Sequence, residues 1–108
     1  MTVSELKDKS GLEVAALPDE NREVTGVYIG DLLSWVMGRA KRGDAWITIM
    51  SNKNVVAVAA LTDCATIILA EGVTPDEGVS ELAVEKGINV LLSKKSAYDT
   101  ALDISKHL

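Results

Sequence analysis

The chain has 108 residues, 47% of them hydrophobic and 25% charged, and its formal net charge is −5. This is the length and composition of one globular domain, which excludes a disordered or fibrous chain. An acidic protein has no general attraction for nucleic acid or for an anionic membrane, so neither is expected as a partner.

The sequence also argues against secretion, membrane insertion and metal binding. No apolar run reaches the roughly 20 residues of a membrane span, and the N-terminal stretch MTVSELKDKS lacks the apolar core of a signal peptide. Cys64 and His107 are the only residues of their kinds, so no disulfide can form within the chain and no set of metal ligands is visible. We therefore expect a cytoplasmic protein without a cofactor.

The first third of the chain predicts two strands. The N-terminal residues are polar, with one helical turn anchored by Leu6. Residues 12–16 fit a first strand, which a turn at Pro18 ends, and residues 23–29 fit a second strand rich in β-branched side chains. Gly26 inside the second strand indicates a bulge or a close approach of another part of the chain.

A helix is predicted next, because apolar residues recur at helical spacing from Leu32 to Ala40. Asp31 is expected to be its N-cap, and Gly43 the residue that stops it. The basic run at residues 39–42 fits the last turn of this helix, where positive charge is favourable. Residues 45–50 then form a buried strand.

The segment that follows this strand has two interpretations. The β-branched residues at 55–58 favour a returning strand. However, parallel pairing with the next apolar run requires a crossover of about a dozen residues, and residues 52–63 have that length. We predict a short buried helix here, with Asn52 or Asn54 as its N-cap.

The last third predicts two helices around one strand. Residues 74–77 combine a capping pattern with proline at the first helical position, and this helix is expected to run to Lys86 and stop at Gly87. Residues 88–92 form a strand, and the capping pattern at residues 96–99 starts a terminal helix. Alternating strands and helices predict a single three-layer α/β/α domain over residues 1–108, with a mainly parallel sheet.

Ligands of open α/β sheets bind beyond the carboxyl ends of the strands. We call this edge the crest, and we expect it to consist of four polar turns at residues 30–34, 51–54, 71–74 and 93–94. The candidate ligand-binding residues are small or polar and lie in these turns or at a strand end. They are Gly30, Asp31, Ser34, Thr48, Asn52, Asn54, Glu71 and Gly72.

Asp31 has a structural and a functional interpretation. As an N-cap it would itself supply the anion that a helix N-terminus attracts, so a phosphate would compete with a carboxylate already in place. A ligand-binding or catalytic role is the other possibility. No Walker or dinucleotide motif and no nucleophile–base pattern is present. The stretch from Gly38 superficially resembles a phosphate-binding loop, but it has Asp44 and Ala45 where the lysine and hydroxyl are required. We favour a module without catalytic activity, although the sequence leaves an enzyme open.

Trp35 lies to one side of the apolar stripe of its predicted helix. It can pack at the edge of the core, or it can form a contact surface, because tryptophan is enriched in protein interfaces. Both interpretations stay open at this point.

Between residues 22 and 105 the chain resembles the DRTGG domain family. The matching features follow one another in order: the Gly30-Asp31 turn, the WIT strand at residues 46–48, the NVVAVA segment from Asn54, and the turn between Ile67 and Pro75. Two positions depart from the family pattern. Leu32 stands where many members have arginine, and Ala70-Glu71-Gly72 stands where they have Thr-Gly-Gly, so an anion-binding role of those residues is not expected here.

The resemblance implies a domain similar to the N-terminal domain of HPr kinase/phosphorylase, without the kinase domain. Such domains also accompany phosphotransacetylases and CBS-domain pyrophosphatases, where they are regulatory or dimer-forming. Stand-alone bacterial members are often encoded near iron hydrogenase and ATPase genes, which suggests a protein partner in redox or hydrogenase metabolism.

We therefore predict a non-catalytic regulatory or protein-interaction module that forms a homodimer and has a small-ligand site at the crest. The alternative is a nucleotide- or phospho-metabolite-responsive sensor, or an enzyme, that uses the same crest residues.

Overall fold

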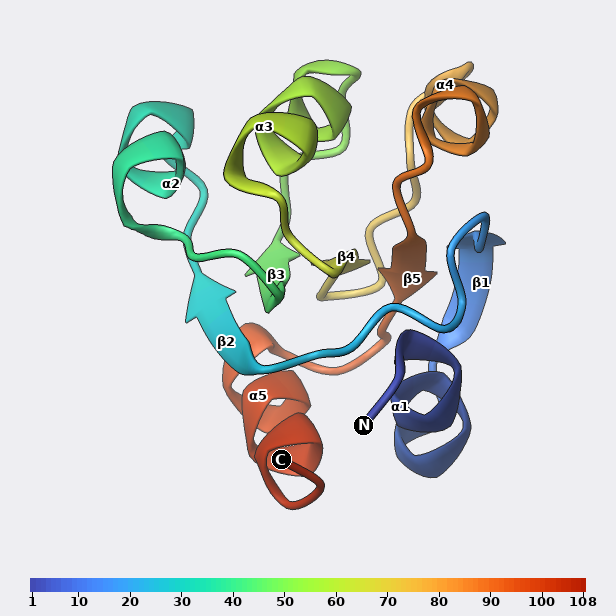
Figure 1. Cartoon of the computed structure of the whole chain (residues 1–108), viewed down its shortest axis with the longest axis vertical. Helices are drawn as coiled ribbons and strands as arrows, with labels where there is room; N and C mark the ends of the chain where they lie inside the picture. Colours follow the sequence, from blue (N-terminus) through green and yellow to red (C-terminus); the bar gives the residue numbers. More distant parts are fainter.

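The computed structural model describes all 108 residues, and its five strands form one sheet in the order β1-β5-β4-β3-β2. The strands are β1 (Glu13–Ala16), β2 (Gly26–Ile29), β3 (Asp44–Thr48), β4 (Thr66–Leu69) and β5 (Val90–Leu92). The helices are α1 (Val3–Ser10), α2 (Leu33–Arg39), α3 (Asn54–Thr62), α4 (Val79–Lys86) and α5 (Ala97–Ser105). Strands β2 to β5 are parallel, and β1 pairs antiparallel with β5 at one edge (Figure 1).

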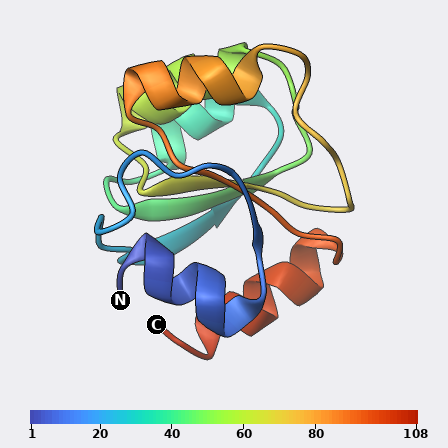
Figure 2. The same ribbon diagram turned by 90° about the vertical axis from the view of Figure 1, so that its right-hand side faces the viewer.

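The sheet is covered by helices on both faces. Figure 2 shows α2, α3 and α4 above the sheet and α1 and α5 below it. This confirms the predicted three-layer α/β/α fold with a mainly parallel sheet. None of the helices is long and apolar enough to cross a membrane.

Alternation along the central strands builds the two halves of the core. In β3, Trp46 belongs to the cluster beneath α2, α3 and α4, while Ala45 and Ile47 belong to the cluster against α1 and α5. In β4, Ile67 and Ile68 divide between the two clusters in the same way. Because both faces are buried, these strands read as continuous apolar runs rather than as alternating patterns.

The ambiguous segment is a helix, as predicted, and α3 supplies the crossover between the parallel strands β3 and β4. Its valines are buried against the sheet, so tertiary packing outweighs their preference for strands. Lys53 occupies the N-cap position without a side-chain bond, while the Asn52 side chain accepts a hydrogen bond from the amide of Asn54 at 2.9 Å. Of the two predicted caps, Asn52 therefore supports the helix start.

Asp31 is not the N-cap of α2, so this prediction is wrong. Leu32 holds the N-cap position without a side-chain hydrogen bond. Asp31 Oδ1 instead accepts hydrogen bonds from the Thr48 hydroxyl at 2.8 Å and the Ile49 amide at 3.0 Å. Two hydrogen-bond donors at the end of the neighbouring strand thus bind the Asp31 carboxylate, which by its local sequence preference would cap the helix.

The prediction that α4 begins at residues 74–77 is also wrong, because α4 starts at Val79 after Gly78. Asp76 bonds across the crest instead: its carboxylate accepts from the Ser51 hydroxyl at 2.8 Å, and its amide donates to the Ser51 carbonyl at 3.0 Å. The predicted end at Lys86 and Gly87 is confirmed. Ser96 likewise caps α5 by accepting from the Asp99 amide at 3.0 Å.

Several boundaries differ from those predicted. Helix α2 ends at Arg39, so the rest of the basic run follows the helix rather than forming its last turn. The second strand is shorter than predicted, because only Gly26–Ile29 pair with β3, and this pairing contains no bulge. A β-carbon on Gly26 would lie 2.7 Å from Asp44 Oδ1, which confirms a close approach at this glycine. The predicted N-terminal turn is a two-turn helix, with a buried Leu6.

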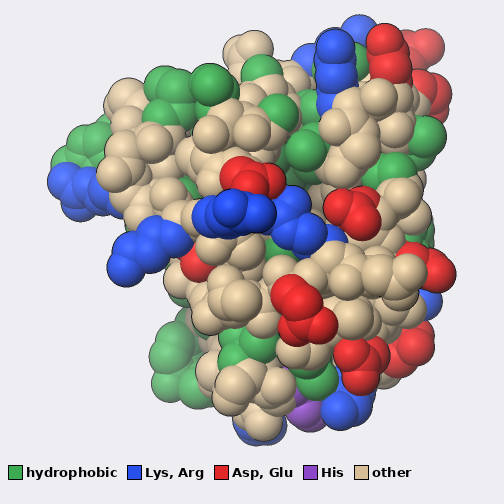
Figure 3. Space-filling view, in the orientation of Figure 1, with side chains coloured by type: hydrophobic (Ala, Val, Ile, Leu, Met, Phe, Trp, Pro, Cys, Tyr) green, Lys and Arg blue, Asp and Glu red, His purple; other side chains and the backbone are tan.

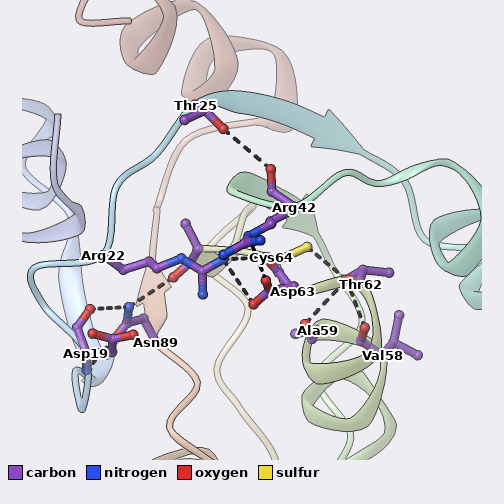
Figure 4. Close-up of polar contacts among 11 residues, drawn as sticks. Asp19, Arg22, Thr25, Arg42, Val58, Ala59, Thr62, Asp63, Cys64 and Asn89 are labelled. Carbon is purple, nitrogen blue, oxygen red and sulfur yellow. Dashed lines mark hydrogen bonds and ion pairs between the residues drawn. The ribbon is translucent and has the colours of Figure 1, made fainter.

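The loop between β1 and β2 crosses the edge of the sheet where the parallel strands begin (Figure 1). The buried Asn89 side chain anchors it by accepting from the Asp19 amide at 2.9 Å and donating to the Asp19 carbonyl at 2.8 Å. Farther along the loop, Arg22 pairs with Asp63 at 3.0 Å, and Arg42 pairs with the same carboxylate at 3.1 Å (Figure 4). These contacts tie the loop to the end of α3.

Candidate functional site at the crest

The four polar turns of the crest follow four neighbouring parallel strands, as predicted. They therefore share one edge of the sheet, which lies at the right of Figure 2. The Ala70 amide donates to the Thr48 carbonyl at 3.0 Å, and the Gly72 amide donates to the Ser93 carbonyl at 2.9 Å. Neighbouring turns are thus held together by the backbone.

Around the ends of β2 and β3, two of the predicted residues, Asp31 and Thr48, form a small hydrogen-bonded group with the neighbouring backbone. Thr48 is buried, and its hydroxyl donates to Asp31 while accepting from the Met50 amide at 3.2 Å. The other oxygen of the exposed Asp31 carboxylate has no hydrogen-bond donor within the chain. This oxygen can receive a hydrogen bond from a ligand. Ser34 is exposed in the first turn of α2, just beyond Asp31.

Glu71 and Gly72 lie at the next turn, where both residues have a left-handed backbone, with φ of 60° and 72°. Their amides donate to the carbonyls of Lys95 and Ser93 at 2.8 and 2.9 Å. Because both amides are used within the fold, neither is a free backbone donor for a phosphate. The Glu71 side chain is exposed.

The concave parts of the surface do not coincide with the group around Asp31. One hollow of about 110 Å³ lies farther along the crest, between the end of β5 and the start of β1, where Ser10, Ser93 and Lys95 contribute to its lining. A larger hollow of about 410 Å³ lies beside β2 and involves Arg39 and Lys41. Residues 93–94 of the first hollow belong to a predicted crest turn, but the rest of its lining and the second hollow were not predicted, because they combine residues from separate segments of the chain. For the second hollow, the basic run at residues 39–42 was the sequence feature that could have indicated it.

Trp35 is 52% exposed and lies among other exposed apolar side chains. Its amide donates to the Leu32 carbonyl, and Leu32 adjoins Asp31, to which the Ile49 amide is bonded. We call this surface the Trp35 patch, which consists of Leu32, Trp35 and Ile49, each at least 46% exposed. Hydrophobic side chains are also visible over α2 at the upper left of Figure 3.

Cys64 is buried, as predicted. Burial raises the pKa of its thiol above the ordinary value, although a contact with the Thr62 hydroxyl at 3.0 Å opposes this shift. The native thiol is therefore protonated and a poor nucleophile. His107 lies beyond the end of α5, and the structure contains no group of three or more His, Cys, Asp or Glu side chains able to hold a metal ion.

The family model of the DRTGG domain matches residues 9–107. The chain belongs to the DRTGG domain family. The match begins earlier than the sequence resemblance, because it includes β1 and the loop that Asn89 anchors. None of the curated proteins matched the chain.

Among solved structures, this DRTGG domain is similar to the regulatory region of a pyrophosphatase from Clostridium perfringens. That structure contains CBS and DRTGG domains in complex with an activator, diadenosine tetraphosphate. The TM-score is 0.77 at 16% sequence identity, over 99% of the present chain and 47% of the other. The chain thus spans about half the length of that protein, and the likeness supports the fold.

Glu71 occupies one of the positions at which the family pattern has glycine, and its left-handed backbone explains that preference. An L-residue in this conformation is strained by about 1–2 kcal/mol, part of which glycine loses again through its greater entropy when unfolded. Glu71→Gly is therefore expected to raise the free energy of unfolding by up to about 1 kcal/mol in urea denaturation. Glu71→Ala, which removes the charge but keeps the strain, should give no such gain; an equal gain would show that the charge was responsible.

Proposed function

We propose that this DRTGG domain is a non-catalytic regulatory module that forms a homodimer through the Trp35 patch and binds a small ligand at the crest. DRTGG domains are regulatory modules. The observation that carries the proposal is the exposure of three large apolar side chains near the partly unpaired carboxylate of Asp31. An interface and a ligand site would then adjoin, so that the ligand can influence assembly.

Self-association is supported by the chemistry of the patch. Clustered exposed apolar side chains indicate an interaction site, whereas scattered ones do not. The Arg39 guanidinium lies 3.7 Å from the centre of the Trp35 ring, which restrains the indole while leaving half of it exposed. A pre-ordered aromatic side chain loses little entropy on binding, which suits it to the centre of an interface.

Sedimentation velocity at tens of micromolar protein tests this part of the proposal. The unmodified chain is expected to sediment as a dimer. Trp35→Ser should weaken the dimer at least about thirtyfold, since truncating a central interface residue costs about 2 kcal/mol or more. Leu61→Ser is the matched control, because Leu61 is 75% exposed on α3, outside the patch. A monomeric unmodified chain, or equal weakening by both variants, would rule out this dimer.

The second candidate function is a nucleotide- or phospho-metabolite-responsive sensor. It is supported by the activator-bound pyrophosphatase region, whose ligand is diadenosine tetraphosphate, and by the hydrogen-bonded pair of Asp31 and Thr48. In this proposal Asp31 accepts a hydrogen bond from a hydroxyl or amino group of the ligand. Asn54 and the exposed Ser34 contribute further polar contacts.

Thermal-shift measurements with diadenosine tetraphosphate, nucleotides and phosphorylated metabolites test the sensor. A ligand at about 100 times its dissociation constant should stabilise the fold by about 2.7 kcal/mol. We expect Asp31→Asn or Asn54→Ala to abolish this gain, and Lys86→Gln, on the exposed end of α4, to leave it unchanged. If no compound in the panel stabilises the protein, only the interaction module remains.

We further propose that the module acts in the bacterial cytoplasm, where Cys64 stays reduced, together with a protein of redox or hydrogenase metabolism. Residues 1–108 would act as one domain. Co-purification from a host that expresses such proteins would test this assignment.

A further inference from the structure

A cationic hollow lies beside β2, away from the Asp31 group and at the other end of the strand. It has a volume of about 410 Å³. Residues 25–28 line one side, and Arg39, Lys41, Arg42 and Asp44 line the other. In Figure 3, Lys and Arg side chains project from the left-hand edge, where β2 lies, and continue toward the centre.

The charge of this hollow is unusual for a chain with a net charge of −5. Of its three cations, only Arg42 forms an ion pair, with Asp63 at 3.1 Å. Arg39 stacks on Trp35, and neither Arg39 nor Lys41 has a carboxylate within 4.0 Å. The one acid in the lining, Asp44, is buried and accepts from the Lys41 amide at 2.7 Å. Two cations therefore remain available for an anionic partner.

The strand along the hollow is also unpaired on its outer side, because β2 is the last strand of the sheet. The Gly30 amide donates inward to the Ile47 carbonyl at 3.2 Å. Since backbone groups alternate along a strand, the amides of Gly26 and Tyr28 also face β3, and those of Val27 and Ile29 face outward. The sequence GVYI carries neither charge nor proline, the usual protection of an exposed edge. Strand β1 at the other edge carries Glu13 and precedes Pro18.

We propose that this groove binds an extended acidic segment of a partner protein, which adds as a sixth strand to β2. The partner's backbone would bond to Val27 and Ile29, and its carboxylates, projecting on the α2 side, would pair with Arg39 and Lys41. Strand addition of this kind takes its affinity from main-chain hydrogen bonds and its specificity from alternate side chains.

A second copy of the chain fits this groove less well. Its exposed edges are β2, which is uncharged, and β1, whose single acid Glu13 already pairs with Lys94 at 3.3 Å. A small anion would use the cations but leave the outward amides of β2 unpaired. The combination of an open strand edge with two unpaired cations favours an acidic polypeptide.

A synthetic peptide of alternating valine and glutamate tests the proposal, because alternation places every carboxylate on one face of the added strand. Titration followed by NMR should shift the amide signals of Val27 and Ile29 and slow their hydrogen exchange at least about tenfold. The same peptide with glutamine in place of glutamate should bind at least about tenfold more weakly. Added salt should weaken only the acidic peptide.

Variants identify the cations. Arg39→Gln with Lys41→Gln should weaken binding of the acidic peptide at least about tenfold, whereas Lys86→Gln with Lys106→Gln, the same charge change at exposed sites elsewhere, should not. Binding without slowed exchange at Val27 and Ile29 would overturn strand addition. If inorganic pyrophosphate binds the groove and displaces the peptide with those amides still unprotected, the hollow is a small-anion site. If the peptide fails to bind, the proposal is wrong.

Discussion

Replacing Trp46 by alanine is expected to lower the free energy of unfolding by roughly 3–5 kcal/mol, the range for removing a large buried aromatic side chain. Trp46 is fully buried in β3 beneath the helices α2 to α4. Its indole N–H also donates to the Gly30 carbonyl at 2.9 Å, so the same side chain holds the turn that leads to Asp31. Urea denaturation followed by circular dichroism measures the loss.

Trp46→Phe separates packing from the hydrogen bond. Phenylalanine keeps most of the apolar contact but cannot donate to the Gly30 carbonyl. Trp46→Phe should therefore lower the free energy of unfolding by less than alanine does, by about 1–3 kcal/mol, because of the unpaired carbonyl and the lost volume. Exchange of amides near Gly30 should increase in both variants. A loss below about 1 kcal/mol for alanine would show that Trp46 does not fill the core.

The second large effect is expected for Asn89→Ala, which should cost roughly 3 kcal/mol. The Asn89 side chain is buried, and it bonds to the Asp19 amide, the Asp19 carbonyl and the Ala65 carbonyl at 2.8 to 2.9 Å. Alanine leaves these backbone groups without partners, and each buried unpaired group costs about 1–3 kcal/mol unless water reaches it. The loop from β1 to β2 should loosen, which hydrogen exchange at Asp19 would detect.

Asn21→Ala is the matched control for this prediction. Asn21 is exposed in the same loop, so its replacement should change the free energy of unfolding by less than about 0.5 kcal/mol. Similar stability losses in the two variants would mean that the loop contributes through its backbone alone, without the Asn89 anchor.

The elements of this fold were largely readable in the sequence. The apolar runs around Ile47, Ile68 and Leu91 are strands that bury both faces, and this pattern depends only on side-chain chemistry. Chain length settled the one ambiguity, because a parallel connection from β3 to β4 requires a crossover and residues 52–63 have room for a helix. The strands could then be predicted to be parallel, which places the crest turns at the same edge of the sheet.

The local caps were less predictable. At Asp31 the pattern of a helix N-cap is present, yet the carboxylate accepts hydrogen bonds from Thr48 and Ile49. At Asp76 a proline-led helix start is present, yet the side chain bonds to Ser51. In both places the competing donors come from residues 17 to 25 positions away, so no local preference could reveal them.

Surfaces were the least predictable feature. Trp35 could be placed beside the apolar face of its helix from spacing alone, but whether it was covered depended on what packs against α2. The basic run at residues 39–42 was predicted to be the last turn of a helix. In the structure Ala40 has an extended backbone, so Lys41 and Arg42 lie beyond the helix. Composition and periodicity were enough for the layers and the crest, since burial of apolar side chains is a property of each segment. The exposure of a side chain, its hydrogen-bond partners and the cationic hollow all depend on how separate segments pack together. Only the tertiary structure therefore determines them.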